Sequence, residues 1–127
     1  MTEKPEKVSR VLLIVDDRDE VRLALARYFA LHFTEIVSAS KADQAEELLR
    51  SRSPELLLCD YYLGPEEPTA IMLIPRWRAE YKCLKRVAIM TGSRSSSIAP
   101  CPEADAIFEK PLNMAMVTQF FMADLQS

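Results

Sequence analysis

Three carboxylates in this sequence stand directly after short apolar segments, where they could serve metal and phosphate chemistry. Asp16 and Asp17 follow Val11–Val15, and Asp60 follows Leu56–Cys59. Like charges this close resist joint ionisation when they are partly buried, so a fold that gathers them usually supplies a positive partner. Carboxylate oxygens are the ligands that Mg²⁺ prefers. The pattern therefore predicts a divalent-cation site, with Mg²⁺ as the expected ion and Mn²⁺ as an alternative.

A hydroxyl and an amine occupy equivalent positions later in the chain. Thr91 follows Val87–Met90, and Lys110 comes shortly after Ala106–Phe108. The ammonium group of a lysine is a compact charge that can pair first with a carboxylate and then with a phosphoryl oxygen. A threonine hydroxyl can donate a hydrogen bond to a second phosphoryl oxygen. Because carboxylates form acyl-phosphates in phosphoryl transfer, Asp60 is the expected nucleophile.

The order of the elements explains how residues so far apart in sequence would meet. Apolar segments typical of buried strands alternate with amphipathic segments typical of helices, five times in succession. This alternation indicates an α/β fold with a parallel sheet and helices on both of its faces. Open α/β sheets place their sites beyond the carboxyl ends of the strands, so all five polar residues are expected on one rim.

Local signals predict where some helices begin and where one is weak. Ser40 is the expected N-cap of a helix over about residues 41–50, and Asn113 caps a last helix that runs to about Leu125. The stretch Ser93–Pro102 is rich in Ser and Pro and forms helix poorly. The fourth of the five helices should therefore be short or irregular.

The segments VLLIVDD, LLLCDYYL, AIMTG and FEKP resemble the motifs of the response-regulator receiver domain of two-component signalling. The resemblance extends from about Arg10 to Leu125. It implies a receiver domain at residues 10–127, after a polar arm at residues 1–9. It also implies a flavodoxin-like fold, in which a doubly wound, five-stranded parallel sheet has the strand order 2-1-3-4-5 and carries five helices.

The resemblance assigns the phosphoacceptor and the metal ligands. It implies that Asp60 accepts a phosphoryl group from a phosphohistidine on a sensor histidine kinase or a histidine phosphotransfer domain. Asp16, Asp17 and Asp60 would hold Mg²⁺ together with the backbone carbonyl of Tyr62. Such a domain catalyses only its own phosphorylation and dephosphorylation, so the protein is not expected to be an enzyme that acts on other substrates.

The resemblance also assigns the residues that bind and respond to the phosphoryl group. Thr91, Gly92 and Lys110 would contact it, and phosphorylation would shift the population toward a state in which Thr91 has moved inward. Receivers tune the lifetime of the aspartyl phosphate two positions after the phosphoacceptor and two after the switch hydroxyl. Those positions are Tyr62 and Ser93, and we expect a bulky Tyr62 to screen the phosphoryl group from water.

Three departures from the family pattern affect the expected switch. Receivers usually carry an aromatic residue three positions before the lysine, where this chain has Ile107, so the usual coupling between the hydroxyl and an aromatic side chain is in question. The segment LGPEEPT replaces the usual MPxxDG after the phosphoacceptor. The interval from Thr91 to Lys110 is a few residues shorter than expected, and the shortfall lies in the Ser- and Pro-rich stretch.

Two other functions stay open at this point. A pseudo-receiver would keep the fold as a docking module without being phosphorylated. A haloacid dehalogenase-type phosphatase would use Asp17 as its nucleophile, because DRDEV matches the DxDxV pattern of that class. The phosphatase interpretation leaves Asp60 without a role, and turnover of p-nitrophenyl phosphate would distinguish it.

Composition limits the class of protein and its partners. The chain of 127 residues is 49% hydrophobic and 28% charged, with a net charge of −3, as expected of one ordinary globular domain. An acidic balance argues against nucleic acid or an anionic membrane as the main partner. The apolar runs are far shorter than the ~20 residues of a membrane span, and the polar N-terminus lacks a signal core. We expect a cytoplasmic protein, monomeric or weakly dimeric, whose downstream target is another protein.

Other chemistries find little support in the sequence. Cys59, Cys83 and Cys101 lack the CxxC spacing of zinc sites, and Gly64 and Gly92 are too few for a phosphate-binding glycine loop. The chain ends soon after the last expected helix, so we expect either a stand-alone receiver or a receiver taken from a longer hybrid kinase.

Overall fold

The computed structural model describes residues 8–94 and 97–123 and places five parallel strands in one sheet. The strands pair in the order β2-β1-β3-β4-β5, which confirms the flavodoxin-like order implied by the sequence motifs. The connections β1–β2, β2–β3 and β3–β4 run through α-helices, the usual crossover in a parallel sheet. The strands are β1 (Val8–Val15), β2 (Phe33–Ala39), β3 (Leu56–Asp60), β4 (Arg86–Thr91) and β5 (Ala106–Glu109).

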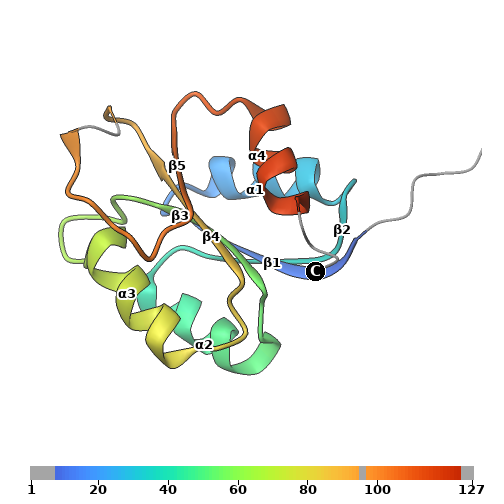
Figure 1. Ribbon diagram of the computed structural model, residues 1–127, viewed down its shortest axis with the longest axis horizontal. Helices are drawn as coiled ribbons and strands as arrows, with labels where there is room; N and C mark the ends of the chain where they lie inside the picture. The colour runs from blue at the N-terminus through green and yellow to red at the C-terminus, as the bar shows by residue number, and fades with distance from the viewer. Residues whose placement is uncertain (1–7, 95–96, 124–127) are drawn as a thin grey trace, which may run out of the picture.

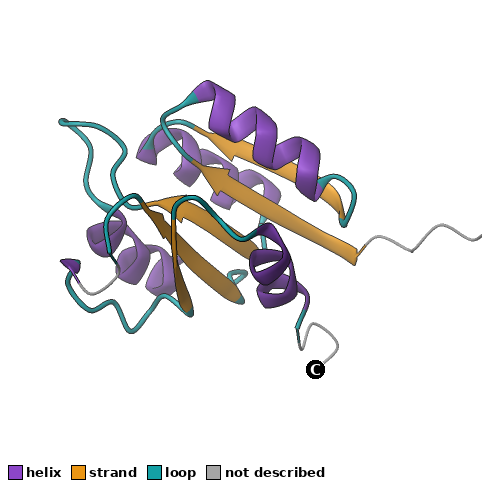
Figure 2. Ribbon diagram, turned by 90° about the horizontal axis from the view of Figure 1, so that it is seen from above, coloured by secondary structure: helices purple, strands orange, loops and turns teal. Residues whose placement is uncertain are grey.

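Helices cover both faces of the sheet, as Figures 1 and 2 show. α2 and α3 pack on one face, and α1 and α4 pack on the other (Figure 1). None of the helices in the described ranges has the length and hydrophobicity needed to cross a bilayer. The α-helices are α1 (Asp19–Phe29), α2 (Ala42–Arg52), α3 (Ala70–Glu80) and α4 (Met114–Met122).

The central strands are apolar on both sides because both sides are covered. Every residue of β3 is buried. On β1, Leu13 and Val15 belong to the core under α2 and α3, whereas Leu12 and Ile14 belong to the core under α1 and α4. Side chains of a strand alternate between faces, so one continuous apolar run fills two cores. This packing fixes the heights at which the strands end, and therefore the rim where the polar residues lie.

The prediction of five helices is wrong for the part of the chain that the structure describes. Between β4 and β5, residues 92–94 and 97–105 contain turns and no α-helix. Buried Cys101 anchors this segment against the α2 and α3 face, and the backbone N–H of Asp105 donates to Val87 O at 2.7 Å. Prolines at positions 100 and 102 explain the result, because proline lacks the N–H that a helix interior needs. The expected irregularity of this region is confirmed.

The two predicted N-caps have opposite outcomes. Asn113 caps α4 as expected, since its side chain accepts a hydrogen bond from the backbone N–H of Met116 at 3.2 Å. Ser40 does not cap α2, because the N-cap position is Lys41 and the Ser40 hydroxyl donates to Gln44 Oε1 at 2.9 Å. Residues 1–7 of the predicted polar arm and residue 125 of the predicted last helix lie outside the described residues.

Candidate functional site

The strand register places the predicted polar residues side by side at one rim of the sheet. β1 and β3 pair so that Asp16 and Asp60 stand at the same level. β3 and β4 pair with Asp60 opposite the residue before Thr91, and β4 and β5 pair with Thr91 opposite the residue before Lys110. The structure therefore brings together residues from four strands, as the order of the apolar segments predicts.

The carboxylates of Asp16, Asp17 and Asp60 form one cluster. Each offers an oxygen, and these oxygens lie within 4.8 Å of one another. Asp16 is fully buried, Asp60 retains 7% exposure, and Asp17 is exposed to solvent. Asp16 Oδ1 accepts the backbone N–H of Arg18 at 2.9 Å, and its own N–H donates to Ala39 O at 3.1 Å. The carboxylate of Asp16 is thus fixed inside the fold, and that of Asp17 is accessible to an ion from solvent.

Lys110 supplies the positive charge that the cluster needs. Its Nζ lies 3.3 Å from Asp16 Oδ2 and 3.4 Å from Asp60 Oδ1. Its backbone N–H donates to Thr91 O at 2.8 Å, which holds the end of β5 beside the end of β4. The peptide bond from Lys110 to Pro111 is cis. The amine therefore bridges two carboxylates and stands where a phosphoryl group bound to Asp60 would meet it.

Burial and like charge make Asp60 an unusual carboxylate. They raise its pKa to about 6, with desolvation as the main cause and the negative charge of Asp16 as the next. Lys110 acts in the opposite direction and Asp17 adds a smaller upward effect. A cation bound among the three acids would oppose this repulsion. Asp60 is therefore ionised at neutral pH but easily protonated in mild acid.

Burial also raises the pKa of the neighbouring Cys59 thiol, and the charges of Asp60 and Asp16 raise it further. A buried thiol with a raised pKa is protonated and unreactive. Cys59 is therefore a small core residue.

A cavity of about 380 Å³ opens over Asp60. A Cβ atom added at Gly92 would have no atom within 4 Å, so the glycine leaves open space at the mouth of the cavity. Tyr62 is 52% exposed and stands on the wall opposite. Thr91 is buried, and its Oγ1 accepts the backbone N–H of Ser93 at 3.0 Å. The lining residues are Asp17, Arg18, Asp60, Tyr61, Tyr62, Thr91, Gly92, Ser93 and Lys110.

Ile107 is not among the residues that line this cavity. It is half-buried and packs with the core under α2 and α3, whereas Phe108 packs on the opposite face with the core under α1 and α4. Strand alternation produces this division. The nearest aromatic side chain on β5 therefore points away from the side that Ile107 occupies, and it does not replace the missing aromatic residue.

The acidic cluster suits a hard divalent cation. Three carboxylates and an open cavity match the preference of Mg²⁺ for a few carboxylate ligands, several waters and a phosphate. Both oxygens of Asp16 already accept a hydrogen bond, from Arg18 N–H and from Lys110 Nζ. A carboxylate oxygen has two lone pairs, so each can still bind an ion. Asp16, Asp17 and Asp60 would therefore hold the ion.

Two structural contacts at the site were not anticipated from the sequence. Arg22 donates from Nη1 to the backbone oxygen of Asp16 at 2.7 Å and pairs with Asp19, so it fixes the turn that carries the acidic pair. Glu67 reaches from the loop after β3 to the backbone N–H of Ala42 at 2.8 Å. The spacing of Asp19 and Arg22 by three positions was the available signal for the first contact.

An apolar groove of about 340 Å³ adjoins the cavity. It lies between the first turns of α1 and α4 and shares Arg18 and Lys110 with the cavity. A groove that continues into a charged cavity has space for a partner as well as for a small anion. Its apolar lining consists of Val21, Ala24, Leu25, Met90, Pro111, Leu112 and Met114.

Comparisons with known proteins agree with this fold. No protein-family profile matches the chain, and no curated protein matches it by sequence. Solved structures do match. A LuxR-family two-component response regulator from Aurantimonas sp. SI85-9A1 is 22% identical with a TM-score of 0.73, over 88% of this chain and 81% of that one. The BeF3-activated receiver domain of RstA from Klebsiella pneumoniae is 22% identical with a TM-score of 0.70, over 84% and 91%.

A third similar structure contains groups of the kind that the site would bind. It is a response regulator from Burkholderia pseudomallei, with a phosphorylated aspartic acid, a calcium ion and citrate. It is 20% identical to this chain with a TM-score of 0.72, over 91% of this chain and 68% of that one. The chain therefore has the fold of response-regulator receiver domains.

Proposed function

We propose that the protein is a phosphoacceptor receiver of a two-component phosphorelay, which takes a phosphoryl group onto Asp60 in a Mg²⁺-dependent reaction. The observation that carries the proposal is the convergence of three carboxylates and Lys110 at one rim of the sheet, where Asp17, Asp60 and Lys110 line a cavity. The site combines a carboxylate nucleophile, ligands for a cation and an amine paired with two of the carboxylates. The fold shared with receiver structures supports the same function.

The residues of the chain divide the reaction between them. A carboxylate oxygen of Asp60 forms the new P–O bond as the P–N bond of the donor phosphohistidine breaks, and the imidazole departs with the electron pair and takes up a proton. Lys110 turns from the carboxylates to a phosphoryl oxygen, and the Thr91 hydroxyl donates to another. Asp16, Asp17, Asp60 and the Tyr62 carbonyl would hold Mg²⁺, which would neutralise charge on the transferring phosphoryl group.

The donor in this proposal is a sensor histidine kinase or a histidine phosphotransfer domain. The apolar groove beside the cavity supports a protein donor, because a small phosphodonor would not contact its apolar lining. A cytoplasmic location, a protein target for the output and a monomeric or weakly dimeric state remain predictions from the sequence.

Acetyl phosphate tests the proposal without knowledge of the donor. With Mg²⁺ present, intact-mass spectrometry should detect one added phosphoryl group on the wild-type protein and on Asp43→Asn, a control at an exposed position of α2. Asp60→Asn and samples treated with a chelator should remain unmodified.

Two outcomes would favour the alternatives. If wild type and Asp60→Asn behave alike towards acetyl phosphate and beryllofluoride, the protein is a pseudo-receiver with a docking role. If the protein turns over p-nitrophenyl phosphate and loses this activity on Asp17→Asn but not on Asp60→Asn, it is a haloacid dehalogenase-type phosphatase.

A further inference from the structure

The first turn of α2 is capped by a residue from a different loop. The N-cap residue, Lys41, makes no side-chain cap, and Glu67 Oε1 instead accepts the backbone N–H of Ala42 at 2.8 Å. Free N–H groups at a helix start favour a carboxylate partner through hydrogen bonding and through the helix dipole. The bond joins α2 to the loop that leaves β3 directly after Asp60.

The base of the loop after β3 is held independently of this bond. Tyr61 N–H donates to Met90 O at 2.7 Å, and Ala70 N–H donates to Tyr61 O at 2.9 Å, which closes the loop. Leu63 is buried in the core under α2 and α3. Glu67 therefore acts on the outer half of the loop.

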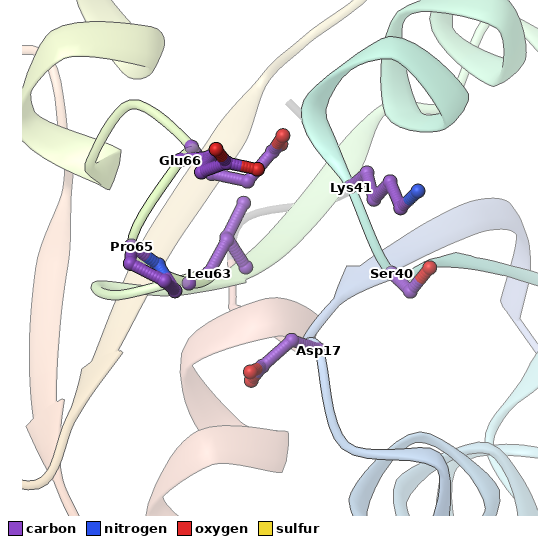
Figure 3. Close-up of a pocket in the computed structure, with 8 residues that line it drawn as sticks. Asp17, Ser40, Lys41, Leu63, Pro65 and Glu66 are labelled. Atoms are coloured by element: carbon purple, nitrogen blue, oxygen red, sulfur yellow. The ribbon is translucent and has the colours of Figure 1, made fainter.

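The outer half of the loop faces Asp17, one of the expected metal ligands, across a second pocket of about 270 Å³ (Figure 3). Ser40 and Lys41 stand on one side of this pocket and Pro65 and Glu66 on the other, with Asp17 on a third side. Gly64 turns the chain at a φ of 130°, a conformation that suits glycine, and its oxygen accepts Glu67 N–H at 3.2 Å. The hydrogen bond between Glu67 and Ala42 joins the two sides of this pocket.

We propose that Glu67 is a positioning residue for the metal site: by capping α2 it holds the outer half of the loop, residues 64–67, across the pocket from Asp17. This inference rests on the proposed function, because it concerns the affinity of the same site for its cation. A loop that is already ordered loses less conformational freedom when an ion binds. The coupling is reciprocal, so a bound cation also tightens the hydrogen bond between Glu67 and Ala42.

Mn²⁺ binding, measured as the loss of the free-ion signal in electron paramagnetic resonance, tests the proposal. Glu67→Ala should weaken binding about threefold to tenfold, because the freed outer half of the loop must then be ordered when the ion binds. Glu67→Gln retains an acceptor and should bind nearly as well as wild type. Glu66→Ala is the matched control, since this exposed neighbour lines the same pocket and caps nothing in the described part of the chain.

A variant on the donor side removes the same hydrogen bond and leaves Glu67 in place. Ala42 is the first residue of α2, where proline is tolerated, and Lys41 has the extended φ of −141° and ψ of 163° that a residue before proline adopts. Ala42→Pro should therefore fold, as checked by circular dichroism, and should weaken Mn²⁺ binding as much as Glu67→Ala does. In wild type, adding Mg²⁺ in the absence of Mn²⁺ should slow hydrogen exchange of the Ala42 amide.

The outcomes separate this inference from the proposed function. Wild type that neither binds Mn²⁺ nor reacts with acetyl phosphate overturns both. Wild type that does both, with Glu67→Ala and Ala42→Pro binding Mn²⁺ equally well, overturns the inference alone. A loss in Glu67→Gln or Glu66→Ala as large as that in Glu67→Ala also overturns it, because the effect would then be one of net charge.

Discussion

The loop after β3 and the segment after β4 border the same cavity but are held in different ways. The loop after β3 is closed at its base by the bond from Ala70 N–H to Tyr61 O, and Glu67 attaches its tip to α2. The segment after β4 begins with the exposed residues 92–94, where Ser93 N–H donates a hydrogen bond to the hydroxyl of Thr91. In the described residues, this segment next enters the core at Cys101.

The difference indicates that the two walls of the cavity, formed by the loop after β3 and by the segment after β4, have different roles. The loop after β3 carries one expected metal ligand, the Tyr62 carbonyl, and starts directly after a second, Asp60, and metal sites gain affinity from fixed ligands. The wall after β4 carries the hydroxyl that would respond to phosphorylation, and a response requires a segment with more than one accessible arrangement. With Ile107 in place of an aromatic residue, any movement of Thr91 would be transmitted through this segment instead.

Replacing Lys110 should produce the largest effect, and it should affect phosphorylation and metal binding in opposite directions. Lys110→Ala removes a donor aimed at the phosphoryl group, so phosphorylation by acetyl phosphate should slow by about a hundredfold or more. The same change removes an amine that competes for Asp16 and Asp60, so Mn²⁺ should bind as tightly as in wild type or more tightly. Intact-mass kinetics and paramagnetic resonance measure the two effects, and Lys85→Ala, at an exposed position, is the control.

A parallel loss of metal binding and phosphorylation in Lys110→Ala would contradict this division. It would mean that Lys110 holds the carboxylates of Asp16 and Asp60 in place rather than binding the phosphoryl group.

Asp60 should destabilise the metal-free protein at neutral pH. Its pKa of about 6 in the fold exceeds its ordinary value of 3.8, so the charged form costs free energy that the protonated form does not. A raised carboxyl pKa gives stability that is present in acid and lost as the pH rises through about 6. Asp60→Asn should therefore be more stable than wild type by about 2 kcal/mol near pH 8, with the difference vanishing only below the ordinary pKa of 3.8.

Urea unfolding of both proteins across this pH range, in the presence of a chelator, measures the difference. Saturating Mg²⁺ should reverse it in favour of wild type, because only wild type has the complete set of acidic ligands. Equal stability of the two proteins at all pH values would mean that Lys110 already compensates the charge of Asp60 in the fold.

The chemistry of the site could be predicted from the sequence because it depends on where strands end. The apolar runs before Asp16, Asp60 and Thr91 mark buried parallel strands, and the carboxyl ends of such strands share one rim. The burial alternation on β5 likewise separates Ile107 from Phe108, as period-two geometry requires. These residues needed only local patterns and one rule of sheet topology.

The loops could not be predicted in the same way. The cap of α2 comes from Glu67, 25 positions beyond its partner Ala42, and no local signal separates Glu67 from the neighbouring Glu66. Ser40 was the natural candidate by residue type, but its hydroxyl bonds to Gln44 instead. In the stretch Ser93–Pro102, the abundance of Ser and Pro predicted only that the fourth helix would be short or irregular. Tertiary contacts decide such segments.

Tyr62 and Ser93 give the smallest expected effect and the most direct comparison, because each lines the cavity from one of the two walls. Tyr62→Ala should shorten the lifetime of the aspartyl phosphate about threefold to tenfold, since less than about 1.4 kcal/mol of barrier depends on excluding water there. Ser93→Ala should change it less than about twofold, because a serine side chain covers little of the cavity. The decay of phosphorylated protein after removal of acetyl phosphate measures both rates. A larger effect at Ser93 than at Tyr62 would place control of the lifetime on the wall after β4, and the fixed loop after β3 would then serve the metal alone.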